Sequence, residues 1–165
     1  MKVLVIGAGR MGAIRVEDLV ADKRVTEVLI ANRNEDKARS LAASFGASVL
    51  PWSEIETAEV DAVVVAVGTS AHQEVLEMVA PKSLAILCEK PIAPTIPGTL
   101  EAIELVEKNG SSLQIGFQRR FDEPIKAMQQ KVASGEVGII YALNMTAHDK
   151  TPSEKEFMAG SGGIF

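Results

Sequence analysis

Short runs of apolar residues, rich in valine and isoleucine, alternate along this chain with longer segments that have helical spacing. The runs are KVLVIG, EVLIA, DAVVVAV, LAILC and SLQIGF. Consecutive apolar residues are typical of strands that are buried on both faces, as in a parallel sheet. Parallel strands need crossover connections, which the intervening segments can supply as helices. The alternation therefore predicts an α/β fold with a doubly wound parallel sheet.

The predicted elements divide the chain into two parts. Four helices are expected between the strands, at residues 11–21, 34–45, 70–80 and 95–109. After them, Asp122 can cap a further helix, and alternating apolar residues predict a strand over 139–147 with one buried face. One helix and one strand cannot build a core of their own. We assign the sheet to residues 1–118, and residues 119–165 to the incomplete start of a second, α+β domain; we expect a longer protein to complete it.

Charge and composition exclude several classes of partner. The 165 residues carry a net charge of −5, and no basic stripe is present, which argues against binding to nucleic acid. The apolar runs are far shorter than a membrane-spanning helix requires, so no membrane partner is expected. The single Cys88 excludes an intramolecular disulfide and suits a reducing cytoplasm.

The segment GAGRMG has the spacing GxGxxG directly after the first strand and at the start of a helix. In a dinucleotide-binding turn Gly7 permits the tight bend, Gly9 lets a pyrophosphate approach the backbone, and Gly12 lets the helix pack closely. Arg10 and Met11 lie at the helix N-terminus, where N–H groups face the phosphates. The alternative is a glycine turn that serves packing only.

The end of the second strand bears on the choice of cofactor. An acid that binds the ribose is expected about 20 residues after the glycines, and Asn32 and Arg33 stand there instead. Asn32 can bind a ribose hydroxyl, and Arg33 can pair with a 2′-phosphate. The sequence therefore slightly favours NADP over NAD. The alternative is that Arg33 is a solvated loop residue.

The stretch ILCEKPIAPT places Glu89 and Lys90 at the carboxyl end of an apolar strand, with Pro91 directly behind them. Ligands of parallel sheets bind outside the carboxyl ends of the strands. Lys90 can hold a substrate hydroxyl or move its proton, with Glu89 orienting the ammonium. The Lys90–Pro91 bond is a candidate for the cis form. The alternative is a pair of exposed loop charges.

Four motifs together resemble successive signatures of the Gfo/Idh/MocA family of NAD(P)-dependent oxidoreductases, and the inositol 2-dehydrogenase branch most of all. They are GAGRMG, CEKPIAPT, GFQRRFDEP and GSGGIF. The resemblance covers essentially the whole chain and implies a Rossmann domain followed by a second domain. It also implies hydride transfer between a nicotinamide and a sugar or cyclitol alcohol or ketone.

The same resemblance assigns residues to the site. It implies that Lys90 acts on the substrate hydroxyl and that Glu89 lies near the cofactor. His72 stands where the family has a histidine after the fourth strand, and it is expected to contact the cofactor. Just before it, Val67 and Gly68 replace the family's Thr-Pro and are expected to contact the cofactor through their backbone.

The remaining assignments concern the nicotinamide end of the site. Gln118 is expected to line the cofactor pocket and Arg119 the substrate pocket, although RRFDEP can equally form a junction of ion pairs. The family's catalytic Asp and His fall after residue 165, and His148-Asp149 comes too early to replace them. We expect a small polyol substrate, no metal, and a homo-oligomer in the full-length form, with weak or no turnover by these residues alone. The alternative is a non-catalytic dinucleotide-binding module.

Overall fold

The structure is a computed structural model that describes residues 1–82, 84–146, 148, 155 and 158. Asp149, the predicted strand end at Ala147 and the closing motif GSGGIF lie outside the described residues.

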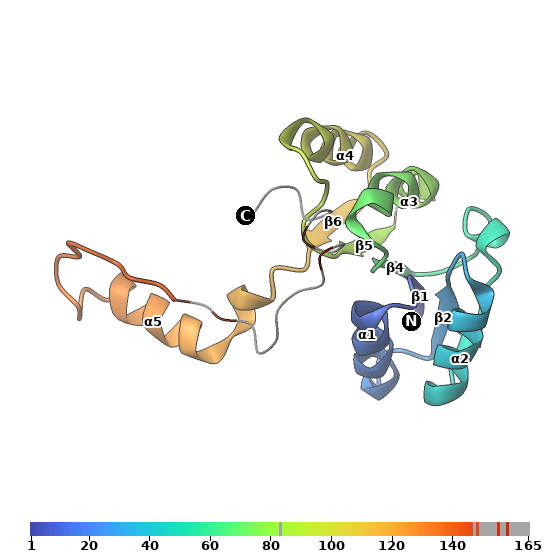
Figure 1. The fold of residues 1–165 in the computed structure, drawn as a ribbon, viewed down its shortest axis with the longest axis horizontal. Coiled ribbons are helices and arrows are strands. Elements are labelled where there is room, and N and C mark those ends of the chain that lie inside the picture. The colour runs from blue at the N-terminus through green and yellow to red at the C-terminus, as the bar shows by residue number, and fades with distance from the viewer. Residues whose placement is uncertain (83, 147, 149–154, 156–157, 159–165) are drawn as a thin grey trace.

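Within the described residues, six parallel strands form one sheet in the order β3-β2-β1-β4-β5-β6 (Figure 1). The strands are β1 (Lys2–Ile6), β2 (Glu27–Ala31), β3 (Ser48–Val49), β4 (Ala62–Val65), β5 (Ala85–Cys88) and β6 (Ser112–Ile115). The strand order reverses direction at β1, with β2 and β3 on one side and β4, β5 and β6 on the other. This topology confirms the predicted doubly wound parallel sheet. The short β3 was not predicted.

Helices cover both faces of the sheet (Figure 1). They are α1 (Arg10–Ala21), α2 (Glu35–Phe45), α3 (His72–Val79) and α4 (Ile96–Lys108), with short 3-10 turns η1 (Trp52–Glu54), η2 (Thr69–Ala71), η3 (Ala80–Lys82) and η4 (Gln118–Phe121). Leu4 and Ile6 of β1 lie in the core cluster shared with α3 and α4. Val3 and Val5 lie in the cluster shared with α1 and α2. Alternate residues of one buried strand thus serve two cores, which explains why the run is apolar throughout.

The helix ends follow from side chains that satisfy free backbone groups. The side chain of Asn34 accepts a hydrogen bond from the backbone of Lys37 at the start of α2. Thr95 does the same for Gly98 at the start of α4. Gly46 ends α2 at φ 68°, in the left-handed conformation that glycine adopts without strain. Local sequence therefore sets where these crossovers begin and end.

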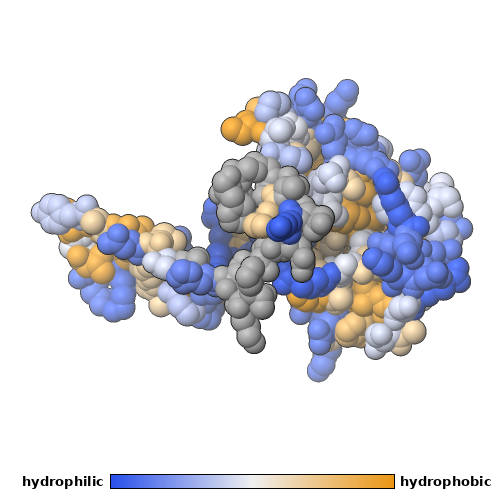
Figure 2. All heavy atoms as spheres, viewed as in Figure 1, coloured by the Kyte–Doolittle hydropathy of each residue, from blue (hydrophilic) through white to orange (hydrophobic). Residues whose placement is uncertain are grey.

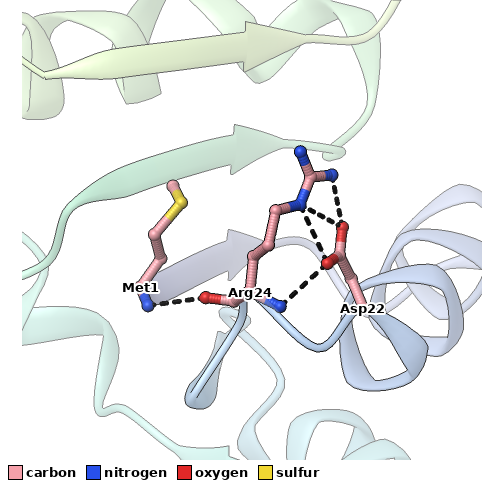
Figure 3. Close-up of polar contacts among 3 residues, drawn as sticks. All are labelled: Met1, Asp22 and Arg24. Atoms are coloured by element: carbon pink, nitrogen blue, oxygen red, sulfur yellow. Dashed lines mark hydrogen bonds and ion pairs between the residues drawn. The ribbon is translucent and has the colours of Figure 1, made fainter.

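A polar contact fixes the loop after α1 at the amino ends of the strands (Figure 3). The Arg24 guanidinium and backbone N–H both donate to Asp22, and the Met1 ammonium donates to the carbonyl of Arg24 over 2.8 Å. The hydrogen bonds from Arg24 lower the pKa of the Asp22 carboxyl to about 2. The contact lies at the amino ends of the strands, whereas the glycine turn follows the carboxyl end of β1. It therefore serves the fold.

The chain after β6 departs from the prediction. The predicted helix is present as α5 (Glu123–Ala133), which starts at the Asp122 cap and runs away from the sheet (Figure 1). Residues 139–146 contain no strand, so that prediction is wrong for the described part. A strand is stable only when it is paired, and no described segment pairs with this one. Hydrophobic side chains lie open along this part of the chain (Figure 2). The side chain of Tyr141 is also open, with 90% of the residue exposed.

None of the helices in the described part of the chain has the length and the apolar character that a membrane crossing requires.

Candidate functional site

Two glycines of the GAGRMG segment, Gly7 before α1 and Gly12 within its first turn, are required by packing. Gly7 has φ 117°, and a Cβ atom on it would lie 2.4 Å from the carbonyl oxygen of Ala66. A Cβ atom on Gly12 would lie 1.9 Å from the carbonyl oxygen of Gly7. Helix α1 therefore packs directly on the turn, as the sequence predicted. For Gly7 and Gly12, close packing is a sufficient explanation.

Gly9 is not explained by packing. It precedes α1 with φ −85°, which any residue can adopt, and a Cβ atom on it would meet nothing within 4 Å. No side chain caps α1, and its first turn contains no acid. The N–H groups at this helix start, which include those of Arg10 and Met11, adjoin open space at the positive end of the helix dipole. This cradle fits the pyrophosphate of a dinucleotide.

Asn32 stands beside the glycine turn. Its side-chain oxygen accepts a hydrogen bond from the backbone N–H of Ala8 over 3.1 Å, and its amide donates to the carbonyl of Asn34 over 2.8 Å. The side chain thereby joins the end of β2 to the turn after β1. Asn32 therefore supports the glycine turn from the neighbouring strand.

Arg33 points to a different set of partners. Its Nη2 pairs with Oε2 of Glu74, and its guanidinium carbon lies 5.3 Å from the centre of the Trp52 ring. The three residues come from the end of β2, from η1 and from the first turn of α3. Arg33 is therefore a paired residue, where the sequence suggested a free one.

Glu89 is buried, with 6% of its surface exposed. We expected it to orient the Lys90 ammonium, but its carboxylate is held by Arg15 of α1. Nε and Nη2 of Arg15 lie 2.8 and 2.7 Å from Oε1 of Glu89. A Cβ atom on Gly116 would lie 2.9 Å from the other carboxylate oxygen. The middle of α1 and the carboxyl ends of β5 and β6 thus meet around one buried charge.

Lys90 follows this buried acid and is exposed. Its peptide bond to Pro91 is cis, as the sequence allowed. Within the described part of the chain, Lys90 has no ion pair. Burial raises the pKa of the preceding Cys88 thiol to about 12, with a further contribution from the Glu89 carboxylate. Cys88 is therefore a core residue, and Lys90 is the group of this segment that solvent and ligands can reach.

His72 has a buried ring, only 1% exposed. Its Nδ1 lies 2.9 Å from the carbonyl oxygen of Pro91 and 3.2 Å from that of Ile92, and its Nε2 lies 3.2 Å from the carbonyl oxygen of Val67. The ring therefore joins the loop after β4 to the loop after β5. The sequence placed His72 among the cofactor contacts, whereas its side chain is bound to the backbone that carries Lys90.

The other predicted contacts lie on loops at the same sheet edge. Val67 is partly buried against the core, and Gly68 precedes η2 with open space around it. Gln118 and Arg119 are exposed in η4, just after β6. Nη1 of Arg119 lies 3.7 Å from Oδ2 of Asp122, which is a local ion pair of the kind predicted for RRFDEP.

A hollow of ≈ 450 Å³ lies at the opposite edge of the sheet, between Lys2, Asp61 and Lys82 among others. Asp61 and Lys82 already have partners there: Asp61 accepts from the backbone of Lys2, and Lys82 donates to carbonyl groups of the loop after η1. The edge that carries the glycine turn is therefore the better candidate site. Among the described residues, no cluster of three or more His, Cys, Asp or Glu could hold a metal ion.

Sequence reasoning missed three residues of this edge: Arg15, Trp52 and Glu74. Each acts through a partner distant in the chain; Arg15 and Glu89, for example, are 74 residues apart. A buried acid at a strand end requires a cation nearby, which predicts that such a partner exists. Only the fold identifies it.

Comparison with known proteins agrees with this geometry. A family profile described as an oxidoreductase family with an NAD-binding Rossmann fold matches residues 1–117. The chain is 32% identical over 168 residues to myo-inositol 2-dehydrogenase of Thermotoga maritima, covering 100% of this chain and 50% of that protein. It is 29% identical over 161 residues to inositol 2-dehydrogenase of Rhizobium meliloti, covering 97% and 49%.

A solved structure gives the same result. The myo-inositol dehydrogenase of Corynebacterium glutamicum superposes with a TM-score of 0.84 at 29% identity, over 99% of this chain and 50% of that one. The chain thus spans about half the length of the relatives it matches.

Proposed function

Because the chain belongs to the Gfo/Idh/MocA oxidoreductase family, we propose that it forms the cofactor-binding part of an NAD(P)-dependent dehydrogenase. The substrate of the whole protein would be a cyclitol or sugar alcohol, or the corresponding ketone. This substrate class is supported by the relatives that are named as inositol dehydrogenases. We also propose a cytoplasmic location, since a free thiol suits a reducing compartment.

The observation that carries the proposal is the uncapped start of α1 at Gly9, on the same sheet edge as Lys90. Strands β1, β4 and β5 are consecutive in the sheet. Adjacent strands lie about 4.8 Å apart, so the ends of β1 and β5 are roughly 10 Å apart. A dinucleotide whose pyrophosphate is bound at the start of α1 would place its nicotinamide within reach of the end of β5.

The cofactor roles follow from position. Gly7, Gly9 and Gly12, with the backbone of Arg10 and Met11, would hold the pyrophosphate. Asn32 would lie at the adenosine ribose. The backbone of Val67 and Gly68 would line the path to the nicotinamide, with Glu89 below it and Gln118 beside it.

Lys90 is the proposed catalytic residue. A nicotinamide cofactor, when bound, would supply reversible hydride transfer between the alcohol and the corresponding ketone. Lys90 would hold the substrate oxygen and help move its proton, with Arg119 lining the substrate side. Arg15 and Glu89 would keep the backbone of Lys90 in place from below, and His72 would hold it from the side. These residues position Lys90 without touching the substrate.

The preference for NADP predicted from Arg33 requires a guanidinium that is free to meet a 2′-phosphate. Arg33 is instead paired with Glu74. The observed contacts therefore support NAD at least as well as NADP.

The test is fluorescence titration of the 165-residue chain with NADH, comparing the wild type with G9A. Since Gly9 has ordinary φ and open surroundings, G9A should fold with wild-type stability. Its methyl group would stand where the pyrophosphate approaches, and NADH binding should weaken about tenfold or more. A second variant, G12A, provides the contrast, because it should lose stability instead. Wild-type NADH affinity in a folded G9A would refute the proposed cradle.

A further inference from the structure

The contacts of Arg33 bear on whether the chain binds NAD or NADP. Arg33 occupies the position at the end of β2 where an arginine can accept the 2′-phosphate of NADP. Its guanidinium rests over the Trp52 ring, and Trp52 itself packs against the core. A guanidinium over an aromatic face is favourable, and the contact keeps Arg33 near this position.

Glu74 is the acid that reaches this position. It lies in the first turn of α3, 41 residues from Arg33 in the chain, and its carboxylate pairs with the Arg33 guanidinium. The acids that follow Arg33 directly in the sequence do not have this role: Glu35, the first of them, pairs with Arg39 on its own helix. The carboxylate that β2 lacks is thus supplied by α3, from the other half of the sheet.

We infer that Glu74 is a cofactor-selectivity residue that makes the chain favour NAD over NADP. The inference rests on the proposed function, since it concerns the ribose end of the same dinucleotide site. Glu74 disfavours the 2′-phosphate in two ways: it occupies the guanidinium that the phosphate would need, and it places a negative charge beside the phosphate. NAD carries a neutral hydroxyl at this position and suffers neither effect.

The size of the effect follows from the exposure of the pair. The side chains of Arg33 and Glu74 are 61% and 49% exposed, so water screens their charges strongly. One like charge about 4 Å away in water changes affinity by about fivefold, and a 2′-phosphate carries up to two. We therefore expect a change in NADPH affinity of about five- to thirtyfold, which declines as salt is added.

The experiment measures the Kd values of NADH and NADPH for the 165-residue chain by fluorescence titration at low salt. The test variant is E74Q, which keeps the shape of the side chain and its ability to bind a hydroxyl. The matched control is E77Q, which removes the same charge one turn later on α3, where Glu77 accepts a hydrogen bond from Gln73. The double variant R33A/E74Q removes the guanidinium as well.

The wild type should bind NADH more tightly than NADPH. E74Q should strengthen NADPH binding by about five- to thirtyfold and leave NADH binding within twofold. E77Q should change neither, and R33A/E74Q should lose the gain for NADPH. An unchanged NADPH affinity in E74Q, or an equal gain for both cofactors, would overturn the inference while leaving the proposed function standing. A folded wild type that binds neither cofactor would overturn both.

Discussion

The ion pair between Arg15 and Glu89 gives the sharpest prediction about the fold beneath the site. R15M removes the guanidinium but keeps most of the side-chain volume. Glu89 is then left with its carboxylate buried, since its side chain is only 8% exposed. Gly116 packs so closely that a Cβ atom there would lie 2.9 Å from the carboxylate, which leaves little room for Glu89 to move toward water.

The cost follows from the general penalty for a buried charge that has lost its partner, about 3–5 kcal/mol. Arg15 is 22% exposed, so some water already reaches the pair, and we expect the lower end of that range. A loss of about 3 kcal/mol is a large part of the roughly 5–15 kcal/mol that stabilises a typical domain. For a chain of this size it corresponds to a fall in Tm of about 10 °C.

The assay is urea unfolding followed by circular dichroism, with R39M as the control. Arg39 also pairs with a glutamate, Glu35, but their side chains are 60% and 50% exposed. Exposed pairs of this kind contribute about 0–1 kcal/mol, so R39M should be nearly neutral. The double variant R15M/E89Q removes the buried charge together with its partner, and should be more stable than R15M. If R15M and R39M lose the same stability, the pair does not hold this edge of the sheet together.

The remaining predictions concern single groups of the site. The Cys88 thiol should react with iodoacetamide at pH 8 roughly a thousandfold more slowly in the folded chain than in urea, since its pKa is about 12 and only the thiolate reacts; equal rates would contradict its burial. H72F should destabilise the fold by about 1–3 kcal/mol, because it leaves partly buried carbonyl groups without a donor, and H72N should recover part of this in the same urea assay; a neutral H72F would show that the ring does not hold the two loops together. K90M should bind NADH within twofold of wild type. In a longer protein that also contains the half of the relatives that this chain does not match, K90M should lower kcat; unchanged turnover would exclude Lys90 from the reaction.

Much of the fold follows from local sequence. The apolar runs predict five of the strands, because a strand buried on both faces needs apolar residues at every position. Asp122 was recognised as a helix cap because its side chain can satisfy the free N–H groups of the first turn. The two-residue strand β3 was not recognised, since so short an edge strand has no periodicity to detect.

The part of the site that depends on backbone geometry could be predicted from the sequence, whereas its side-chain ion pairs could not. The glycine turn is set by steric limits that a spacing motif records. The partners of Glu89 and Arg33 come from α1 and α3, and no local pattern gives their identity. The predicted strand over 139–147 fails in its described part, residues 139–146, for a related reason. Alternation shows that a segment is able to form a strand, whereas a partner decides whether it does.

The central claim is that Lys90 meets the redox end of a dinucleotide whose pyrophosphate rests on the start of α1. The most direct measurement is a crystal structure of the chain with NADH bound. We expect the pyrophosphate at Gly9 and the Lys90 ammonium on the nicotinamide side of the same sheet edge, within about 3 Å of where the hydroxyl oxygen on the hydride-donating carbon would lie. A dinucleotide bound at the opposite edge of the sheet, or a Lys90 ammonium directed away from the nicotinamide, would contradict it.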